Sequence, residues 1–282
     1  MKYDIVKDQF LDKNKLKEYF INELGWKWGD EGRLVFDFLM KAAEKSKGGI
    51  VLDAGAGTQR YKPFFNQSIY LAQEHPQIGA AHDKYDILCD VKSIPLKNSS
   101  IDLILSTSSL EHMQYPDLFI KESYRVLKPS GALYIHAPFV YNEHMVPYDF
   151  QRYTRYGLQN IYKNAGFENI TVTPTTSSLT SAKEWFIHGL IEDSTLKGLG
   201  RKGKLIRKMI LFLFRLLANF SIYLFEDGPK NETTFPIGWV AEGYKKGSKT
   251  KSKTYSSKKL LIESVAMFDE NFTMQNGKIF PK

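Results

Sequence analysis

Short runs of β-branched and other apolar residues alternate along the chain with longer segments in which apolar residues recur every three to four positions. The short runs are bounded by Gly, Pro, Asn, Asp or Ser, as strands commonly are, and they lie at 49–57, 68–75, 85–90, 100–108 and 131–138. Helical spacing is found at 10–47, 110–127 and 155–165. Because strands and helices alternate, the pattern predicts an α/β fold with a parallel, doubly wound sheet.

The second half of the chain continues this alternation and interrupts it once. Strands are predicted at 167–173 and 235–244, with an insertion at 174–234 between them. Within it, residues 205–225 are almost entirely apolar and about long enough to cross a bilayer. Four polar residues interrupt this apolar segment: Arg207, Lys208, Arg215 and Asn219. A simple transmembrane helix is therefore not predicted.

A helix over 205–225 would have a narrow polar stripe and a wide apolar face, and the basic residues Arg201, Lys202 and Lys204 precede it. This pattern is typical of a helix that lies in a membrane interface. The alternative is a helix that caps a binding site or packs in a dimer. Both interpretations stay open at this point.

The composition is that of a folded globular protein: 282 residues, of which 43% are apolar and 25% charged. The single cysteine, Cys89, excludes a disulfide framework and any cysteine-based metal cage, which need several thiols. The first 20 residues carry charges throughout and do not resemble a secretory signal, so we expect a cytoplasmic protein.

The formal net charge of +8 is unevenly distributed. Residues 195–262 hold 15 Lys or Arg and 4 Asp or Glu, whereas the rest of the chain holds 24 and 27. Such a basic segment favours an anionic partner, and the candidates are a membrane surface, a phosphorylated substrate and nucleic acid. For residues 245–259 a solvated Lys-rich tail is the simpler interpretation.

A glycine-containing turn follows the first predicted strand. Asp53, Gly55 and Gly57 stand at its carboxyl end, where doubly wound sheets bind ligands. Glycine at these positions allows a bound cofactor to approach the backbone closely. Glu74 ends the second strand, 21 residues after Asp53, and can accept hydrogen bonds from two ribose hydroxyls. Arg60 occupies the third glycine position of dinucleotide-binding turns, so S-adenosylmethionine, which lacks phosphate, fits better.

These residues resemble the class I S-adenosylmethionine-dependent methyltransferases, particularly their type-11-like group, over about 48–167 and again at 236–244. The first motif resembles the family's glycine turn, and IDLILSTSSLEHM and ESYRVLKPSGALYIHAP resemble later motifs in the same order. Gln59 and Ser130 replace family glycines. The resemblance implies a Rossmann-like, mostly parallel seven-stranded sheet whose last strand is antiparallel.

The resemblance also implies the cofactor and the residues that bind it. S-adenosylmethionine would be the methyl donor, Glu74 would hold its ribose, and Ser106 with Thr107 would line its methionine part. Asp90 would accept from the adenine amino group, while the backbone amide of Val91 faces the ring. The predicted cofactor residues are Asp53, Gly55, Gly57, Glu74, Asp90, Val91 and Ser106.

The predicted organisation has three parts. Residues 1–47 form N-terminal helices that are part of a cap on the substrate side, 48–244 form the methyltransferase domain with its insertion at 174–234, and 245–282 form a Lys-rich tail onto which LLIESVAMF could fold back.

The segment after the fifth strand is dense in ionisable and aromatic residues, which indicates the pocket of the methyl acceptor. His144 is the first choice for a general base because an unperturbed histidine titrates near neutral pH. Glu143 or Asp149 could orient it, and His112 could line the cofactor pocket or cap a helix. Arg152 and Arg155 could pair with an acidic or phosphorylated acceptor, or form ordinary surface salt bridges. No familiar ligand spacing indicates a metal site.

The leading hypothesis is an O-methyltransferase acting on a small molecule or on a glycan or lipid-linked sugar, with peripheral contact to an anionic membrane through 201–225. One alternative is an RNA-modifying or RNA-binding protein that uses the basic C-terminal third, although no recognised RNA-binding module accompanies the charge. A non-catalytic methyltransferase-like scaffold is another. The acceptor atom and the oligomeric state are left open.

Overall fold

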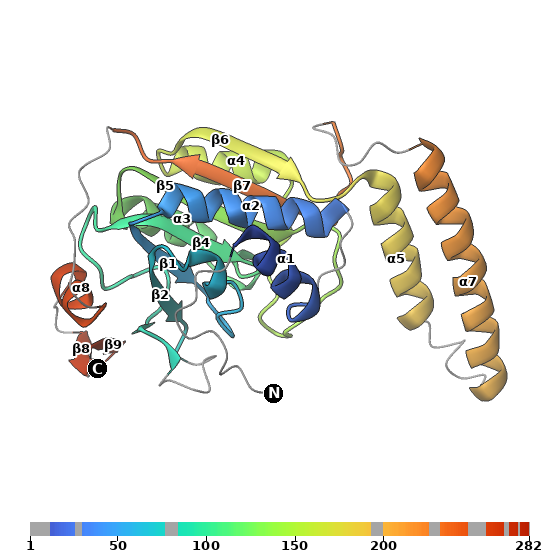
Figure 1. Cartoon of the computed structure of the whole chain (residues 1–282), viewed down its shortest axis with the longest axis horizontal. Coiled ribbons are helices and arrows are strands. Elements are labelled where there is room, and N and C mark those ends of the chain that lie inside the picture. Colours follow the sequence, from blue (N-terminus) through green and yellow to red (C-terminus); the bar gives the residue numbers. More distant parts are fainter. Residues whose placement is uncertain are drawn as a thin grey trace.

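The computed structural model describes residues 12–25, 30–76, 84–192, 200–225, 232–247, 258–267, 271–275 and 277–281. Within them a nine-stranded sheet has the order β6-β7-β5-β4-β1-β2-β3-β9-β8 (Figure 1). The strands are β1 (Ile50–Ala54), β2 (Ile69–Glu74), β3 (Ile87–Leu88), β4 (Ile101–Thr107), β5 (Leu127–Pro138), β6 (Glu168–Pro174), β7 (Gly238–Tyr244), β8 (Phe272–Gln275) and β9 (Lys278–Pro281).

The helices fall where the chain passes from one strand to the next and at the N-terminal side. The α-helices are α1 (Lys13–Asn22), α2 (Asp30–Ser46), α3 (Pro116–Val126), α4 (Arg155–Asn164), α5 (Ser178–Glu192), α7 (Gly200–Phe225) and α8 (Lys258–Val265). In the part of the chain that the structure describes, the short 3₁₀ helices are η1 (Lys62–Phe65) and η3 (Leu110–His112). The segment predicted as one helix at 110–127 is thus divided into η3 and α3.

The predicted doubly wound sheet is confirmed. β1 pairs in parallel with β2 and β4, and β5 extends the parallel set beyond β4. β7 runs antiparallel to both of its neighbours, β5 and β6, as the family resemblance implied for the last of seven strands. β6 therefore has the same direction as β5, so the carboxyl ends of β1, β2, β4, β5 and β6 lie along one edge of the sheet.

The expected number of strands was wrong. The C-terminal segment adds a hairpin of β8 and β9, and β9 pairs in parallel with β3 through Ile279 and Ile87. Helix α8 returns to the body as well, since Leu261 and Ile262 are buried in the core. The segment called a tail thus folds back, as LLIESVAMF suggested, while its Lys-rich stretch at 248–257 lies outside the described residues.

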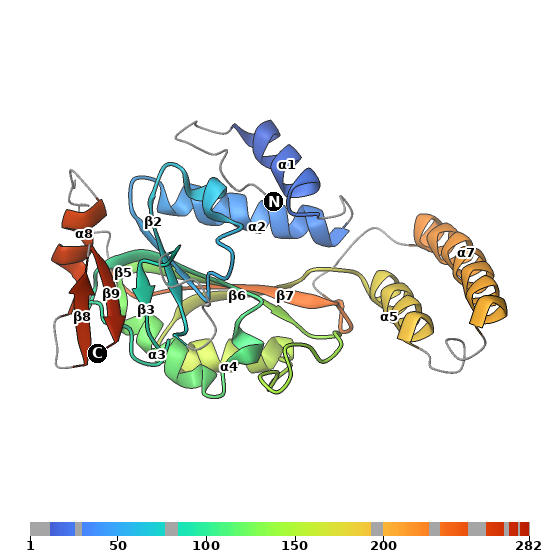
Figure 2. The same cartoon turned by 90° about the horizontal axis from the view of Figure 1, so that it is seen from below.

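Two apolar cores cover the two faces of the sheet. On one face α1, α2 and η1 contribute large side chains such as Phe20, Phe36 and Phe65. On the other face α3, α4 and α8 contribute Phe119, Tyr162 and Leu261. Figure 2 shows this three-layer arrangement, with α1 and α2 on one side of the sheet and α3 and α4 on the other. The N-terminal helices therefore pack on the sheet itself.

The insertion forms a hairpin of α5 and α7 that lies to one side of the sheet in both views (Figures 1 and 2). The rings of Phe186 and Phe214 hold the two helices together, with centroids 4.0 Å apart. Many apolar side chains of α7 are exposed: Leu205, Met209, Phe212, Leu213, Leu216, Leu217, Phe220 and Tyr223. In the described part of the chain, no helix combines the length and apolarity needed to cross a membrane.

Candidate active site

The glycine turn that follows β1 is held against η3. Gly55 has a φ of +74°, and a Cβ built there would lie 2.0 Å from the Oγ of Ser109. Gly57 has a φ of +51°, but a Cβ there would meet nothing within 4 Å. Gly55 is thus required by packing and backbone conformation, whereas the space beside Gly57 is open to a ligand. Because Ser109 precedes η3, the post-β1 turn and the post-β4 segment are direct neighbours.

Asp53 lies at the end of β1 and is buried, with 2% of its surface exposed. The Tyr70 hydroxyl donates to its Oδ2, while Oδ1 has no hydrogen-bond partner among the described residues. Burial raises the pKa of Asp53 to about 7. The Oγ of Ser106, at the end of β4, is also buried without a partner in the described structure. Both strand ends thus present polar atoms that a ligand could satisfy.

Glu74 ends β2, and its carboxylate faces the glycine turn. One oxygen accepts from the Gly57 backbone N–H at 2.8 Å, and the other accepts from the His75 N–H at 2.9 Å. A carboxylate offers about four acceptor positions, so two remain for hydroxyl groups. Gln73 braces this edge, because its side chain accepts from the Gly55 N–H and donates to the Cys89 carbonyl.

The remaining predicted cofactor residues follow β3. Asp90 is partly exposed; its Oδ1 accepts from the Lys92 N–H at 3.0 Å, and its Oδ2 pairs with the Lys92 ammonium at 2.9 Å. Val91 is half-buried and packs against the core. The side chain of Asp90 is therefore engaged by Lys92, and its role toward adenine stays a prediction.

The two departures from the family pattern adopt backbone conformations that favour glycine. Gln59 has a φ of 56° and Ser130 a φ of 61°. The side chain of Gln59 donates to the Lys84 carbonyl at 2.6 Å. Both residues thus reproduce the shape of the glycine turns at some conformational cost, and neither removes a carboxylate of the site.

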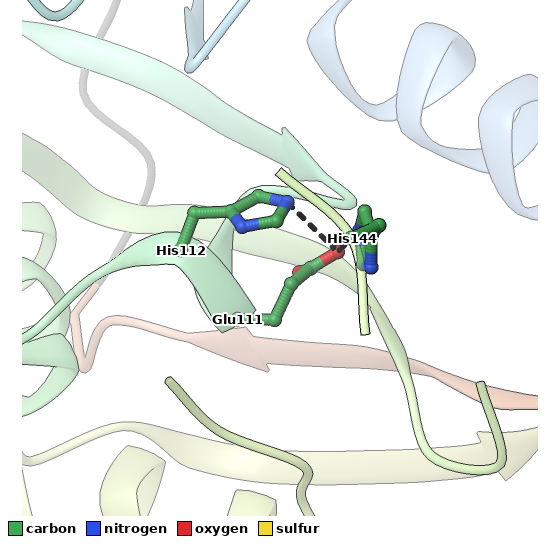
Figure 3. A group of neighbouring side chains, drawn as sticks. All are labelled: Glu111, His112 and His144. Carbon is green, nitrogen blue, oxygen red and sulfur yellow. Dashed lines mark ion pairs between the residues drawn. The ribbon is translucent and has the colours of Figure 1, made fainter. Parts of the chain in front are cut away.

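Three side chains from two loops meet beyond the cofactor residues (Figure 3). Glu111 and His112 belong to η3, and His144 comes from the loop after β5. The Nε2 atoms of both histidines lie 3.8 Å from Oε1 of Glu111, and the two imidazole rings are 4.7 Å apart between centroids. The structure thus brings His112 and His144, which the sequence singled out separately, to one carboxylate.

Of the two acids proposed to orient His144, the structure brings Asp149 to it. The Asp149 carboxylate accepts from the His144 backbone N–H at 2.9 Å and lies 3.3 Å from Nδ1. Glu143 is exposed. Arg152 forms a bidentate pair with Asp149 at 2.5 and 2.7 Å, which holds the pKa of Asp149 well below its usual range. Arg152 thus forms the salt bridge that was one of its two expected roles, and its role toward an acidic acceptor stays a prediction.

Glu111 is the residue that sequence reasoning missed. Its side chain is fully buried, and neither carboxylate oxygen has a hydrogen-bond partner in the described structure. Burial raises its pKa to about 7. In the sequence it looks like a polar position of an amphipathic helix, but η3 ends at His112 and directs Glu111 inward. The adjacent His112 was the available signal.

The hydrogen-bond acceptors of the cofactor residues fit S-adenosylmethionine. The open space at Gly57, the two remaining acceptor positions of Glu74 and the unpartnered Oδ1 of Asp53 match, in kind, a ribose and a cationic amino group. Within the described residues this edge offers carboxylates rather than a cluster of basic groups for phosphate. The edge is therefore suited to a cationic nucleoside.

The comparisons with known proteins agree with this assignment. Residues 52–135 match the family model described as a methyltransferase domain. The malonyl-[acyl-carrier protein] O-methyltransferase of Marinomonas sp. is 29% identical over 118 residues, 37% of this chain and 43% of that protein. The 25S rRNA (adenine(645)-N(1))-methyltransferase of Schizosaccharomyces pombe is 28% identical over 93 residues, 33% of this chain and 29% of that protein.

A solved structure from Thermotoga maritima, a methyltransferase described as a possible histamine N-methyltransferase, has 19% identity and a TM-score of 0.48, covering 83% of this chain and 100% of that one. The chain matches less than half the length of each of the two sequence relatives. The matched region contains the glycine turn, Glu74, Asp90 and Glu111, which are the residues that build the site. Residues 52–135 therefore match a methyltransferase domain, and this match supports S-adenosylmethionine as the methyl donor.

Proposed function

We propose that this protein transfers the methyl group of S-adenosylmethionine to an oxygen atom of its acceptor. The observation that supports this most is the contact between the cofactor turn and η3 at Gly55 and Ser109. Because Ser109 directly precedes η3, this contact supports an acceptor site at Glu111, His112 and His144, beside the glycine turn. A carboxylate and two imidazoles are groups that assist loss of a proton from a hydroxyl.

The reaction itself needs positioning more than covalent help from the protein. The acceptor oxygen attacks the methyl carbon, a C–O bond forms, and the C–S bond breaks to leave the neutral thioether of S-adenosylhomocysteine. The hydroxyl proton must leave at the same time. With its Nε2 free, His144 takes this proton, and Asp149 stabilises the resulting imidazolium through Nδ1. Glu111, whose carboxylate lies beside Nε2, adds a second negative charge when ionised.

For the acceptor we propose a hydroxyl on a lipid-linked molecule, a sugar being the simplest case. The hairpin of α5 and α7 leaves the sheet after β6 and returns at β7, so it hangs from the same edge as the site. Its exposed apolar side chains are accompanied by Lys204, Lys208 and Arg215, which are also exposed. This combination suits the interface of an anionic bilayer. The side chains of Arg201 and Lys202 lie outside the described residues.

Two measurements test the proposal. Calorimetric titration with S-adenosylmethionine tests the donor site, and a screen of hydroxylated acceptors with tritiated donor tests turnover. Recovery of the label in a methyl group bound to oxygen supports the proposal. Label recovered only on nitrogen or in RNA would contradict it, and tight donor binding with no turnover on any acceptor would favour a scaffold.

Membrane contact is tested by sedimentation with vesicles. The protein should pellet with vesicles of phosphatidylglycerol and phosphatidylcholine, and less with phosphatidylcholine alone. A variant with Lys204→Glu, Lys208→Glu and Arg215→Glu should stay in the supernatant. Equal partition of the two proteins would overturn this part of the proposal, as would a doubled mass by light scattering that disappears when the apolar face of α7 is made polar.

A further inference from the structure

The group of Glu111, His112 and His144 has the composition of a metal site. Each residue offers one ligand atom, and these three atoms all lie within 4.8 Å of one another. The two histidine nitrogens approach the same carboxylate oxygen, each at 3.8 Å. This distance is too long for a hydrogen bond. A cation with bonds of about 2.1 Å would need its neighbouring ligands about 3 Å apart, so the side chains would have to approach one another by about 1 to 2 Å to close the site.

The buried carboxylate is the second observation that points to a ligand. The Glu111 side chain has no exposed surface, and both of its oxygens are without a hydrogen-bond partner in the described residues. Burying a carboxylate in this way is costly unless a positive charge or a set of donors compensates it. The guanidinium of Arg152 lowers the pKa of Glu111, but it is itself paired with Asp149. A bound cation would supply the missing compensation.

The histidines are also held in the form that ligates. The Nδ1 of His112 donates to the Tyr148 carbonyl at 2.6 Å, and the Nδ1 of His144 faces the Asn142 carbonyl at 3.1 Å and the Asp149 carboxylate. Because Nδ1 carries the proton in both rings, the lone pair of each neutral ring is at Nε2, toward Glu111. Metal-bound histidines commonly donate their other N–H to a carbonyl or carboxylate in this manner.

We propose that Glu111, His112 and His144 bind a divalent first-row transition cation, such as Zn²⁺ or Mn²⁺. Two imidazoles and one carboxylate suit these ions better than Mg²⁺ or Ca²⁺, which favour oxygen ligands. Three protein ligands leave positions open for another molecule. This step rests on the proposed function: the acceptor hydroxyl would take one of these positions, where the cation lowers the hydroxyl pKa and the proton is released to water. In this state His144 is a ligand and no longer the base.

The binding test uses the full chain, stripped with EDTA and dialysed, and titrated calorimetrically with ZnCl₂ and with MnCl₂. We expect one site per chain. Glu111→Gln, His112→Ala and His144→Ala should each weaken binding by about 100-fold or more, and Asp149→Asn by about 10- to 100-fold through the orientation of His144. The matched control is His188→Ala, an exposed histidine of α5, which should bind as the unaltered protein does.

Each sample is also checked by circular dichroism and titrated with S-adenosylmethionine. Folded variants that lose the cation and keep the cofactor support the metal site. Equal cation affinity in all variants, or no binding by the unaltered protein at millimolar concentration, would overturn it while the cofactor titration still reports on the proposed function. If one variant does not fold, the other two ligand variants carry the test.

Discussion

Two buried carboxylates at the same sheet edge differ in how the fold supports them. Asp53 lies near the end of a central strand and accepts from Tyr70 on the neighbouring strand. One of its oxygens is thus satisfied, and the other has no partner among the described residues. Glu111 comes from a short 3₁₀ helix, and neither of its oxygens is satisfied among the described residues. The cofactor side is therefore largely formed by strand ends and backbone, whereas the acceptor side depends on loop side chains and, in our proposal, on what they bind.

The largest expected effect comes from a substitution that disrupts only the acceptor side, the group of Glu111, His112 and His144. Glu111→Gln keeps the shape of the side chain and removes its charge, so turnover should fall by about 100- to 1,000-fold, the range found when groups that stabilise developing charge are lost. Affinity for S-adenosylmethionine should stay within about twofold, since Glu111 lies outside the cofactor residues. Single-turnover rates measure the loss of methyl transfer, and calorimetry measures the affinity for S-adenosylmethionine.

The converse change is Glu74→Ala on the cofactor side. Two hydrogen bonds to a charged group contribute about 3 kcal/mol or more, so affinity for S-adenosylmethionine should fall by about 100-fold or more. Cation binding at Glu111 should be unaffected. Calorimetry measures the binding of both ligands on one sample. Loss of both S-adenosylmethionine and cation binding would show that the cofactor side and the acceptor side depend on each other.

The raised pKa of Asp53 predicts a pH dependence. Its folded pKa of about 7 lies above the usual aspartate value of 3.8, so the folded state holds the proton more tightly. The free energy of unfolding should therefore fall as pH rises from about 4 to about 7. A cationic cofactor favours the ionised form, so affinity for S-adenosylmethionine should rise by about tenfold from pH 6 to pH 8 and then level off.

The control for this dependence is Asp53→Asn, which has no titrating proton. Its affinity for S-adenosylmethionine should be weaker and nearly flat over the same pH range. A tenfold rise that persists in this variant would assign the titration to another group and would contradict the proposed role of Asp53.

The smallest expected effect concerns the hairpin. Neutralising one exposed cation, as in Lys204→Gln, should weaken partition to anionic vesicles by about fivefold, which corresponds to about 1 kcal/mol per basic residue near the surface. Cofactor affinity should not change. A matched neutralisation on α4, at the exposed Lys163, should leave vesicle partition unchanged if the hairpin is the contact surface.

The relative positions of Asp53 and Glu74 could be predicted from the sequence because they depend on local rules. The ends of adjacent parallel strands must meet at one edge, so the spacing of Asp53 and Glu74 was sufficient to place them together. The packing partner of Gly55 could not be predicted, because Ser109 is distant in the sequence and reaches the turn only through the order of β1 and β4.

The acceptor side was predicted in part. His144 and Asp149 lie within one loop, and Asp149 was one of the two acids expected beside His144. Glu111 was missed because its inward direction depends on where η3 ends. The hairpin of β8 and β9 was missed because each strand has only four residues. So few apolar positions do not show the alternation that predicts a strand. Non-local packing decided both features.

The most direct test of the central claim is a crystal structure with S-adenosylhomocysteine. We predict that both ribose hydroxyls lie within hydrogen-bond distance of the Glu74 carboxylate, that the amino group faces Asp53, and that the sulfur points toward Glu111 and His144. A ligand bound elsewhere, or a sulfur directed away from these two residues, would contradict the claim that one sheet edge joins the cofactor and acceptor sides.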